Sequence, residues 1–397
     1  MKKKLLFIIP SLSSGGGERS LVNLLNQIDY SEYEVDLFLL NHQGLFMEHL
    51  PGEVKVLPLP EQYRLFSQPA HQSVFMLLAK GYYRVAFNRI LYSIRHRYRD
   101  NLSIREQYNW KYLSECFPPF DDQYDAAIGF LEKTSTYMCV DKVSARKKIG
   151  WVHIDYDQMG MDASFDGLYF RKLHQIVTVS EECAAVLHKR FPEISKKVSV
   201  IHNIVSPAVI RRLADADRTD VFSRGKKEVV ILSIGRLHYQ KSFETAVEAC
   251  KKLIDWGYDV QWNIIGEGVE RAPLMELIST NNLEAHFHLL GLKSNPYPYL
   301  LQADIYVQTS RFEGKSIAID EAKIMNKPIV VTDFSTAKDQ IKNEVDGLIV
   351  EMNAEAVARG VERLINDERL RKQLSDNLST LQLGTETEID KLYRLLA

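Results

Sequence analysis

Cysteine is scarce in this sequence, and its distribution limits what the chain can be. Only four of the 397 residues are cysteines, and no two have the Cys-x-x-Cys spacing of a zinc or redox motif. The sequence therefore argues against a disulfide scaffold and a structural zinc site, and it favours a reducing cytoplasm. Apolar runs long enough for a membrane-spanning helix are also lacking. The four positions are Cys116, Cys139, Cys183 and Cys250.

An excess of charge of one sign is absent as well. The chain has 50 Lys and Arg residues against 52 Asp and Glu residues, a formal net charge of −2. No overall field therefore attracts nucleic acid. Residues 1–9 imitate a signal peptide, but the apolar run stops at Pro10 after five residues, and no small-residue cleavage site follows. We interpret this segment as a buried first strand.

Short apolar segments alternate with helical patterns along the whole chain. This alternation predicts an α/β fold of parallel sheets with helices on both faces, and the length suits two domains. Residues 205–227 are polar and charged, and we interpret them as an interdomain link. We predict an N-terminal domain over 1–206 with a helical insertion at about 73–117, a C-terminal domain over 207–380, and a final helix over 381–397. That helix is a candidate to pack back on the N-terminal domain.

Two glutamates eight positions apart, Glu313 and Glu321, form the most informative pattern. Glu313 lies in a glycine-containing turn after an apolar strand predicted at 303–310. Glu321 lies in the first turns of a predicted helix that Ser316 can cap. The carboxyl end of a strand is where open α/β sheets bind ligands, so the pair can hold the hydroxyls of a sugar and of a ribose. Taken alone, the pair would more often be a loop glutamate and a solvated helix glutamate.

Two cations follow another apolar strand. Gly235 ends the strand predicted at 228–234, and Arg236 and Lys241 come directly after it. The strand has no structural need for these charges, whereas a diphosphate can use the planar fork of arginine and the point charge of lysine. A helix predicted to begin near Ser242 or Phe243 adds its positive N-terminal end. Taken alone, the two cations could equally be surface charges.

Together these stretches resemble the nucleotide-sugar half of the retaining glycosyltransferases of the GT-B fold, specifically the large family 4. The resemblance extends to three glycines after the first strand and to a Trp-Val-His-Ile-Asp run in the middle of the chain; these are Gly15 to Gly17 and Trp151 to Asp155. It implies two Rossmann-like domains that face one another across a cleft. It also implies transfer of a sugar without a metal or another cofactor.

The resemblance assigns roles to particular residues. It implies a catalytic set of Glu313, His153, Arg236 and Lys241. It implies donor contacts from Gly16, Gly17, Gly235, Arg236, Lys241, Glu313, Gly314, Lys315, Ser316 and Glu321. It implies that Asp155 contacts the acceptor. From the residues themselves, His153 would more often be a structural histidine at a strand end, and the three glycines could be a flexible turn.

The implied reaction moves a hexose from a nucleotide diphosphate-sugar to a hydroxyl of a glycan, polyol-phosphate or lipid-linked acceptor, in the synthesis of bacterial surface polysaccharide. UDP is the commoner nucleotide in the family, and GDP stays open. The chain departs from the common family pattern at Lys315 to Ala318 and at Phe334 to Asp339, near where a donor sugar would lie. Two alternatives remain: a nucleotide-sugar epimerase of the same fold, and a non-catalytic partner subunit.

The predicted insertion contains a basic stretch, residues 79–105, with seven Lys or Arg residues and the single acid Asp100. Phe87, Ile90, Leu91 and Ile94 have helical spacing, which predicts a basic amphipathic helix. Such a helix can lie on the anionic inner leaflet of the cell membrane, which would make the enzyme cytoplasmic and peripheral. Alternatively, its apolar side faces the protein core. No motif supports nucleic-acid binding.

Overall fold

The computed structural model describes residues 2–13, 15–97, 101–215, 220–222 and 228–397. The chain divides into two compact units. The first consists of residues 1–13, 17–202 and 389–397, and the second of residues 14–16 and 203–388. Each unit has one sheet in which every described strand pair is parallel.

The sheet of the first unit has the strand order β3-β2-β1-β4-β5-β6-β7. Residues 5–9 of the central strand β1 are all buried, because helices cover both faces of a parallel sheet. The edge strand β3 is shorter than the predicted 54–59, since Pro58 and Pro60 have no N–H to donate to a neighbour. The strands are β1 (Lys3–Ile9), β2 (Tyr33–Leu39), β3 (Lys55–Val56), β4 (Gln123–Gly129), β5 (Ser144–Val152), β6 (Gln175–Thr178) and β7 (Val198–Val200).

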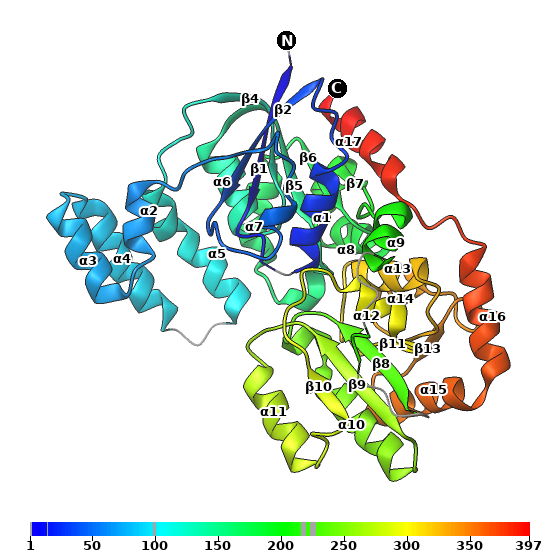
Figure 1. The fold of residues 1–397 in the computed structure, drawn as a ribbon. Helices are drawn as coiled ribbons and strands as arrows, with labels where there is room; N and C mark the ends of the chain where they lie inside the picture. The colour runs from blue at the N-terminus through cyan, green and yellow to red at the C-terminus, as the bar shows by residue number, and fades with distance from the viewer. Residues whose placement is uncertain (1, 14, 98–100, 216–219, 223–227) are drawn as a thin grey trace. The chain divides into compact units, whose positions relative to one another are not determined.

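The helices of the first unit include the predicted insertion (Figure 1). In the described part of the chain it comprises three α-helices, and Gly81 with φ 78° separates the first from the second. These are α3 (Ala70–Ala79), α4 (Tyr83–His96) and α5 (Leu102–Leu113), and α2 (Glu61–Phe66) precedes the insertion. The others are α1 (Gly16–Leu25), α6 (Thr134–Lys142), α7 (Ala163–Phe170), α8 (Glu181–Arg190) and α17 (Ile389–Leu396). Arg99 and Asp100 of the predicted basic helix lie outside the described residues.

The second unit repeats the same topology, with the strand order β10-β9-β8-β11-β12-β13. This is the doubly wound order of Rossmann-type sheets, and the predicted α/β fold with two such sheets is confirmed. The central strands β8 and β11 lie side by side, so their carboxyl ends meet at one edge. The strands are β8 (Val229–Ile234), β9 (Val260–Ile265), β10 (Phe287–Leu289), β11 (Ile305–Gln308), β12 (Ile329–Thr332) and β13 (Leu348–Val350).

The helices of this unit begin close to the predicted positions at the candidate site. Helix α10 starts at Phe243, as predicted, and α13 follows Ser316. Within the predicted link, residues 207–215 instead form α9, because Ile210 and Ala214 bury one face of a helix. The helices are α9 (Pro207–Asp215), α10 (Phe243–Asp255), α11 (Arg271–Thr280), α12 (Tyr297–Gln302), α13 (Ile317–Ile324), α14 (Ala337–Gln340), α15 (Ala354–Asn366) and α16 (Glu368–Ser379). In the described part of the chain, no helix has the length and apolarity needed to cross a membrane.

Candidate functional site

The polar face of β11 forms the base of the candidate site. Tyr306 and Gln308 point the same way because side chains alternate along a strand, and Ser310 continues this face beyond the strand end. The Gln308 carboxamide oxygen accepts hydrogen bonds from Tyr306 Oη at 2.8 Å and from Ser316 Oγ at 3.0 Å. Its nitrogen donates to Glu313 Oε1 at 2.9 Å. Gln308 therefore joins the strand, the turn and the start of α13.

Sequence reasoning missed Gln308, although one signal was available. It ends an otherwise apolar strand, and a buried carboxamide in such a place must find partners for both its donor and its acceptor. The predicted helix cap at Ser316 is wrong for a related reason. Ser316 occupies the N-cap position, but among the described residues its hydroxyl makes no cap hydrogen bond. The hydroxyl instead donates to Gln308.

Glu313 lies at the centre of this network and is 6% exposed. Its Oε1 accepts hydrogen bonds from Lys241 Nζ at 2.5 Å and from Ser310 Oγ at 2.6 Å, in addition to the Gln308 amide. Its Oε2 accepts from Gln240 Nε2 at 3.2 Å. Glu313 and Lys241, 72 residues apart in the chain, thus form an ion pair with side-chain exposures of 8% and 15%. A buried pair of this kind leaves a costly isolated charge when one partner is removed.

The two predicted cations after β8 differ in how far they are buried. Gly235 lets Lys241 lie against the backbone, because a Cβ at this position would be 2.9 Å from Lys241 Cε. Arg236, in contrast, is exposed. Burial and the nearby positive charge of Arg236 both lower the pKa of His238, which therefore stays neutral at physiological pH.

Glu321 is also buried, at 2% exposure, within the first two turns of α13. Tyr297 of α12 donates a hydrogen bond from Oη to Glu321 Oε1 at 2.9 Å. Both glutamates of the predicted pair therefore lie inside the unit, and the interpretation of Glu321 as a solvated helix residue is wrong. Burial of two carboxylates requires a dedicated set of donors, which this site supplies.

The second segment that departs from the common family pattern, residues 334–339, and the residue after it also contact the turn 313–316. Gln340 makes a two-way contact with the Ser316 backbone: Ser316 N–H donates to Gln340 Oε1 at 2.8 Å, and Gln340 Nε2 donates to the Ser316 carbonyl at 2.8 Å. Thr336 Oγ1 donates to the Glu313 carbonyl at 3.2 Å. Lys315 Nζ lies 3.8 Å from Asp320 Oδ2, and both side chains are 14% exposed. Thr336 of that segment and the adjoining Gln340 therefore help to hold the turn 313–316.

In the first unit, His153 follows β5 directly. Its ring packs against Phe130 and Trp151, with ring centroids 4.8 and 6.0 Å apart. Its Nε2 is buried and has no hydrogen-bond partner among the described residues. Its backbone N–H donates to Glu132 Oε2 at 3.2 Å, and burial raises the pKa of that carboxyl group. A Cβ at Gly17 would be 2.8 Å from Leu131 Cδ2 and 3.9 Å from the His153 ring, so a larger residue there would require the Leu131 side chain to shift.

Burial lowers the pKa of His153 to about 3, which predicts a specific pH dependence of stability. Between pH 3 and pH 6.5 the unfolded chain binds a proton at this position and the folded chain does not, so stability falls as the pH decreases below 6.5. At pH 5 the loss is about 2 kcal/mol, from about 1.4 kcal/mol per pH unit. We expect His153→Gln to remove this part of the loss, measured by denaturant unfolding at pH 7 and pH 5. Parallel losses in the two proteins would contradict the assignment.

Asp155 is 3% exposed and accepts a hydrogen bond from the Asp157 N–H at 3.2 Å, which caps the turn Tyr156–Met159. Asp157 in turn pairs with Arg190 at 2.8 Å. The run Asp155-Tyr156-Asp157 has the Asp-x-Asp spacing of a metal motif. Among the described residues, however, no group of three or more His, Cys, Asp or Glu side chains is arranged to hold a metal ion.

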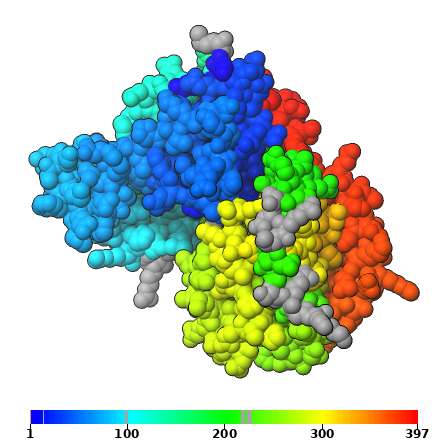
Figure 2. Space-filling model, viewed as in Figure 1, coloured from blue at the N-terminus to red at the C-terminus, as the bar shows by residue number. Residues whose placement is uncertain are grey.

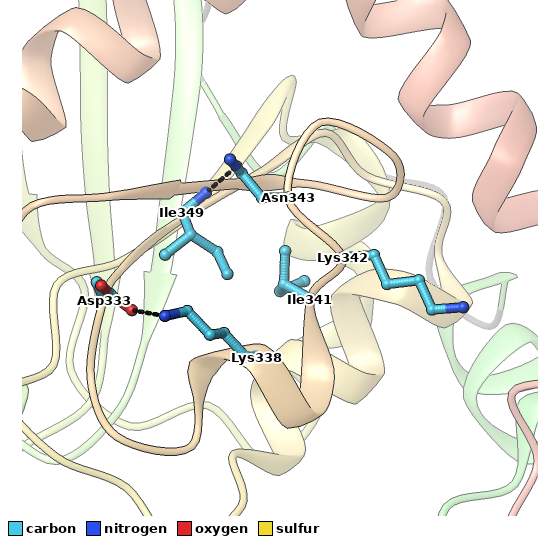
Figure 3. Close-up of a pocket in the computed structure, with 6 residues that line it drawn as sticks. All are labelled: Asp333, Lys338, Ile341, Lys342, Asn343 and Ile349. Atoms are coloured by element: carbon cyan, nitrogen blue, oxygen red, sulfur yellow. Dashed lines mark hydrogen bonds and ion pairs between the residues drawn. The ribbon is translucent and has the colours of Figure 1, made fainter.

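A separate pocket of about 450 Å³ lies beside β12 and β13 (Figure 3). Lys338 and Asp333 face one another across part of it at 3.7 Å, whereas Lys342 points away. Its described lining contains none of the predicted site residues, so we assign it no part in the site. The lining residues are Asp333, Lys338, Ile341, Lys342, Asn343 and Ile349.

The sequence of the chain is similar to those of known glycosyltransferases. Residues 216–379 match the family described as glycosyl transferases group 1. The chain is 24% identical over 383 residues to N-acetylgalactosamine-N,N'-diacetylbacillosaminyl-diphospho-undecaprenol 4-alpha-N-acetylgalactosaminyltransferase of Campylobacter jejuni, covering 95% of this chain and 94% of that one. Over a shorter stretch of 145 residues, 36% of this chain and 29% of that one, it is 26% identical to poly(ribitol-phosphate) alpha-N-acetylglucosaminyltransferase of Staphylococcus aureus.

Solved structures share the fold at low sequence identity. A variant of S. aureus TarM in complex with fondaparinux, alpha-GlcNAc-glycerol and UDP superposes with a TM-score of 0.67 at 15% identity, over 99% of both chains. Anabaena HepE in complex with UDP-glucose gives a TM-score of 0.69 at 14% identity, again over 99% of both. These matches and the two Rossmann-type sheets identify the chain as a glycosyltransferase of the GT-B fold, whose residues 216–379 carry the group 1 glycosyl transferase domain.

Proposed function

We propose that this enzyme is a retaining family 4 hexosyltransferase that uses a UDP-sugar. The observation that carries the proposal is the buried Lys241–Glu313 pair at the adjoining ends of β8 and β11, with the exposed Arg236 on the same loop as Lys241. Such an edge offers cations to a diphosphate and a fixed carboxylate to sugar hydroxyls. The two neighbours of known structure, which contain UDP or UDP-glucose, make UDP the first nucleotide to test.

The proposed chemistry depends on stabilising the leaving diphosphate. As the bond between the sugar and phosphate breaks, Arg236 and Lys241 take up the developing negative charge. Glu313 already holds Lys241 in place before the donor arrives, so little reorganisation is needed. We assign Glu313 to the sugar hydroxyls and Glu321 to the ribose. The glycines at 16, 17, 235 and 314, together with Lys315 and Ser316, complete the proposed donor contacts.

We assign acceptor binding to the first unit, through His153 and Asp155. The Nε2 atom of His153 supports this role, because a buried nitrogen without a protein partner is suited to a ligand hydroxyl. The C. jejuni relative is named for a diphospho-undecaprenol acceptor and the S. aureus relative for poly(ribitol-phosphate). By analogy we propose a lipid-linked or polyol-phosphate acceptor, in surface polysaccharide synthesis at the inner face of the cell membrane.

Ligand-dependent stabilisation tests the donor class. A UDP-sugar at 100 times its Kd should raise the free energy of unfolding by about 2.7 kcal/mol. We expect thermal shifts with UDP and UDP-sugars but not with GDP or ADP compounds. Glu321→Gln should reduce the shift for every uridine compound, because a ribose contact is common to them all. Stabilisation by GDP-sugars alone would overturn the UDP assignment, and incubating UDP-sugars without an acceptor would reveal an epimerase.

A further inference from the structure

Helix α4 in the first unit presents an apolar stripe to solvent. Tyr83, Phe87, Ile90 and Ile94 follow the i, i+4, i+7, i+11 spacing of one helix face and are 70%, 61%, 43% and 50% exposed. The buried residues Val85 and Ala86 hold the other side of the helix in the core. The predicted amphipathic helix is therefore present, but its apolar residues at 87, 90 and 94 do not face the protein. The core-facing alternative is wrong for these positions.

Helix α3 packs beside α4 (Figure 1) and also exposes apolar side chains. Its Phe75 is 73% exposed and its Met76 is 41% exposed. Figure 2 shows both helices at the surface of the first unit. We use the term hairpin face for Phe75, Met76, Tyr83, Phe87, Ile90 and Ile94. Soluble proteins rarely expose many large apolar side chains together unless the surface binds something.

The charge pattern around the hairpin face indicates the chemistry of its partner. Residues 62–99 contain seven Lys and Arg residues and no Asp or Glu, although the whole chain has 52 acids. Some of these cations have internal partners: Lys80 pairs with Glu61 at 3.1 Å, and Arg89 donates to the Phe66 carbonyl at 2.9 Å. Arg97, at the end of α4, is exposed. Arg84 pairs with Glu115 at 2.8 Å. The hairpin region therefore has exposed apolar side chains and more cations than carboxylates, which fits an anionic, hydrophobic partner.

We propose that the hairpin face docks on an anionic lipid bilayer. Its aromatic and aliphatic side chains would enter the boundary between headgroups and acyl chains, while nearby cations meet lipid phosphates. A second copy of the chain fits less well, because a two-fold contact would bring the same cation-rich surface against itself. Nucleic acid would not need the exposed Phe and Ile side chains. The docking proposal rests on the proposed function in one respect only, namely that the acceptor is located at the membrane.

Cosedimentation with vesicles tests this docking. We expect the wild type to bind phosphatidylglycerol vesicles at low salt, more weakly at high salt, and phosphatidylcholine vesicles at least tenfold more weakly. Phe87→Ser with Ile90→Ser should reduce phosphatidylglycerol binding at least tenfold. Val269→Ser with Met275→Ser is the matched control, since these side chains are 79% and 54% exposed but belong to the second unit. Equal melting temperatures would show that all variants fold.

Two further measurements separate docking from catalysis and from self-association. With a water-soluble acceptor, Phe87→Ser with Ile90→Ser should transfer sugar at the wild-type rate, so a wild type that binds vesicles but transfers no sugar would contradict only the proposed function. Failure of the wild type to bind phosphatidylglycerol vesicles would overturn the docking proposal. Equal vesicle binding by the wild type and by Phe87→Ser with Ile90→Ser would also overturn it. A wild-type dimer in analytical sedimentation that this double variant abolishes would overturn it as well.

Discussion

Lys241→Met is expected to lower both the stability of the second unit and the rate of sugar transfer. The substitution leaves the Glu313 carboxylate buried at 6% exposure without its counter-ion, which typically costs about 3–5 kcal/mol of stability. It also removes a charge that stabilises the leaving diphosphate, for which a loss of about 10²–10³ in kcat is typical. Denaturant unfolding and steady-state kinetics measure the two effects separately.

A double variant distinguishes the two roles of Lys241. Lys241→Met with Glu313→Gln removes both charges, so most of the lost stability should return while kcat stays low. The control is Asp346→Asn, which breaks another buried ion pair of this unit, between Asp346 and Lys323 at 3.0 Å. We expect it to reduce stability without the large loss in kcat. Recovery of activity along with stability in the double variant would make the Lys241–Glu313 pair purely structural.

Arg236→Ala should impair transfer without a matching loss of stability. Arg236 is exposed, so its truncation leaves no cavity in the core. Losing one donor that stabilises developing charge costs about 2.7–4 kcal/mol in the transition state, or about 10²–10³ in kcat/KM. Arg236→Lys should recover only part of this, because an ammonium group lacks the planar fork of guanidinium.

Arg359→Ala provides the comparison for Arg236. Arg359 lies on α15 of the same unit with its side chain 57% exposed, where it contacts Glu355 and Glu362. It should leave kcat/KM unchanged. The Arg236 assignment would fail if Arg236→Ala kept kcat/KM within threefold of the wild type, or if both variants slowed transfer equally.

The sequence predicted the fold because its strands are short, apolar and separated by helical patterns. It also predicted which charges stand at strand ends, since Arg236 and Lys241 follow an apolar strand without a structural reason. It did not predict that Lys241 contacts Glu313, because 72 residues separate them and nothing local indicates the pairing. For the same reason, the sequence did not show which groups the carboxamides of Gln308 and Gln340 contact. Each is a single polar residue whose partners become neighbours only when strands and helices pack.

For the helical insertion, the sequence suggested more available cations than the structure has. Counting cations suggested that all of them are available to a membrane, but Arg89 turns inward to the carbonyls of Phe66 and Gln68. Spacing correctly placed Phe87, Ile90 and Ile94 on one helix face, and only the packing of α3 and α4 shows that this face is exposed. Periodicity identifies a face, and the tertiary structure decides what covers it.

The return of residues 389–397 to the first unit has a consequence for biosynthesis. Tyr393 of α17 stacks on Tyr33 of β2 with ring centroids 5.2 Å apart, and its hydroxyl accepts a hydrogen bond from the Asp29 N–H at 2.8 Å. Lys147 of β5 donates to the Leu395 carbonyl at 3.0 Å. Domains usually fold in the order in which the ribosome releases them. Here the first unit is synthesised first, but it is complete only after α17, at its C-terminal end, has been synthesised. The whole sheet of the second unit is synthesised before α17. The nascent first unit therefore spends the translation of residues 203–388 with the α17 contacts of its sheet unmade, an interval in which chaperones can bind it.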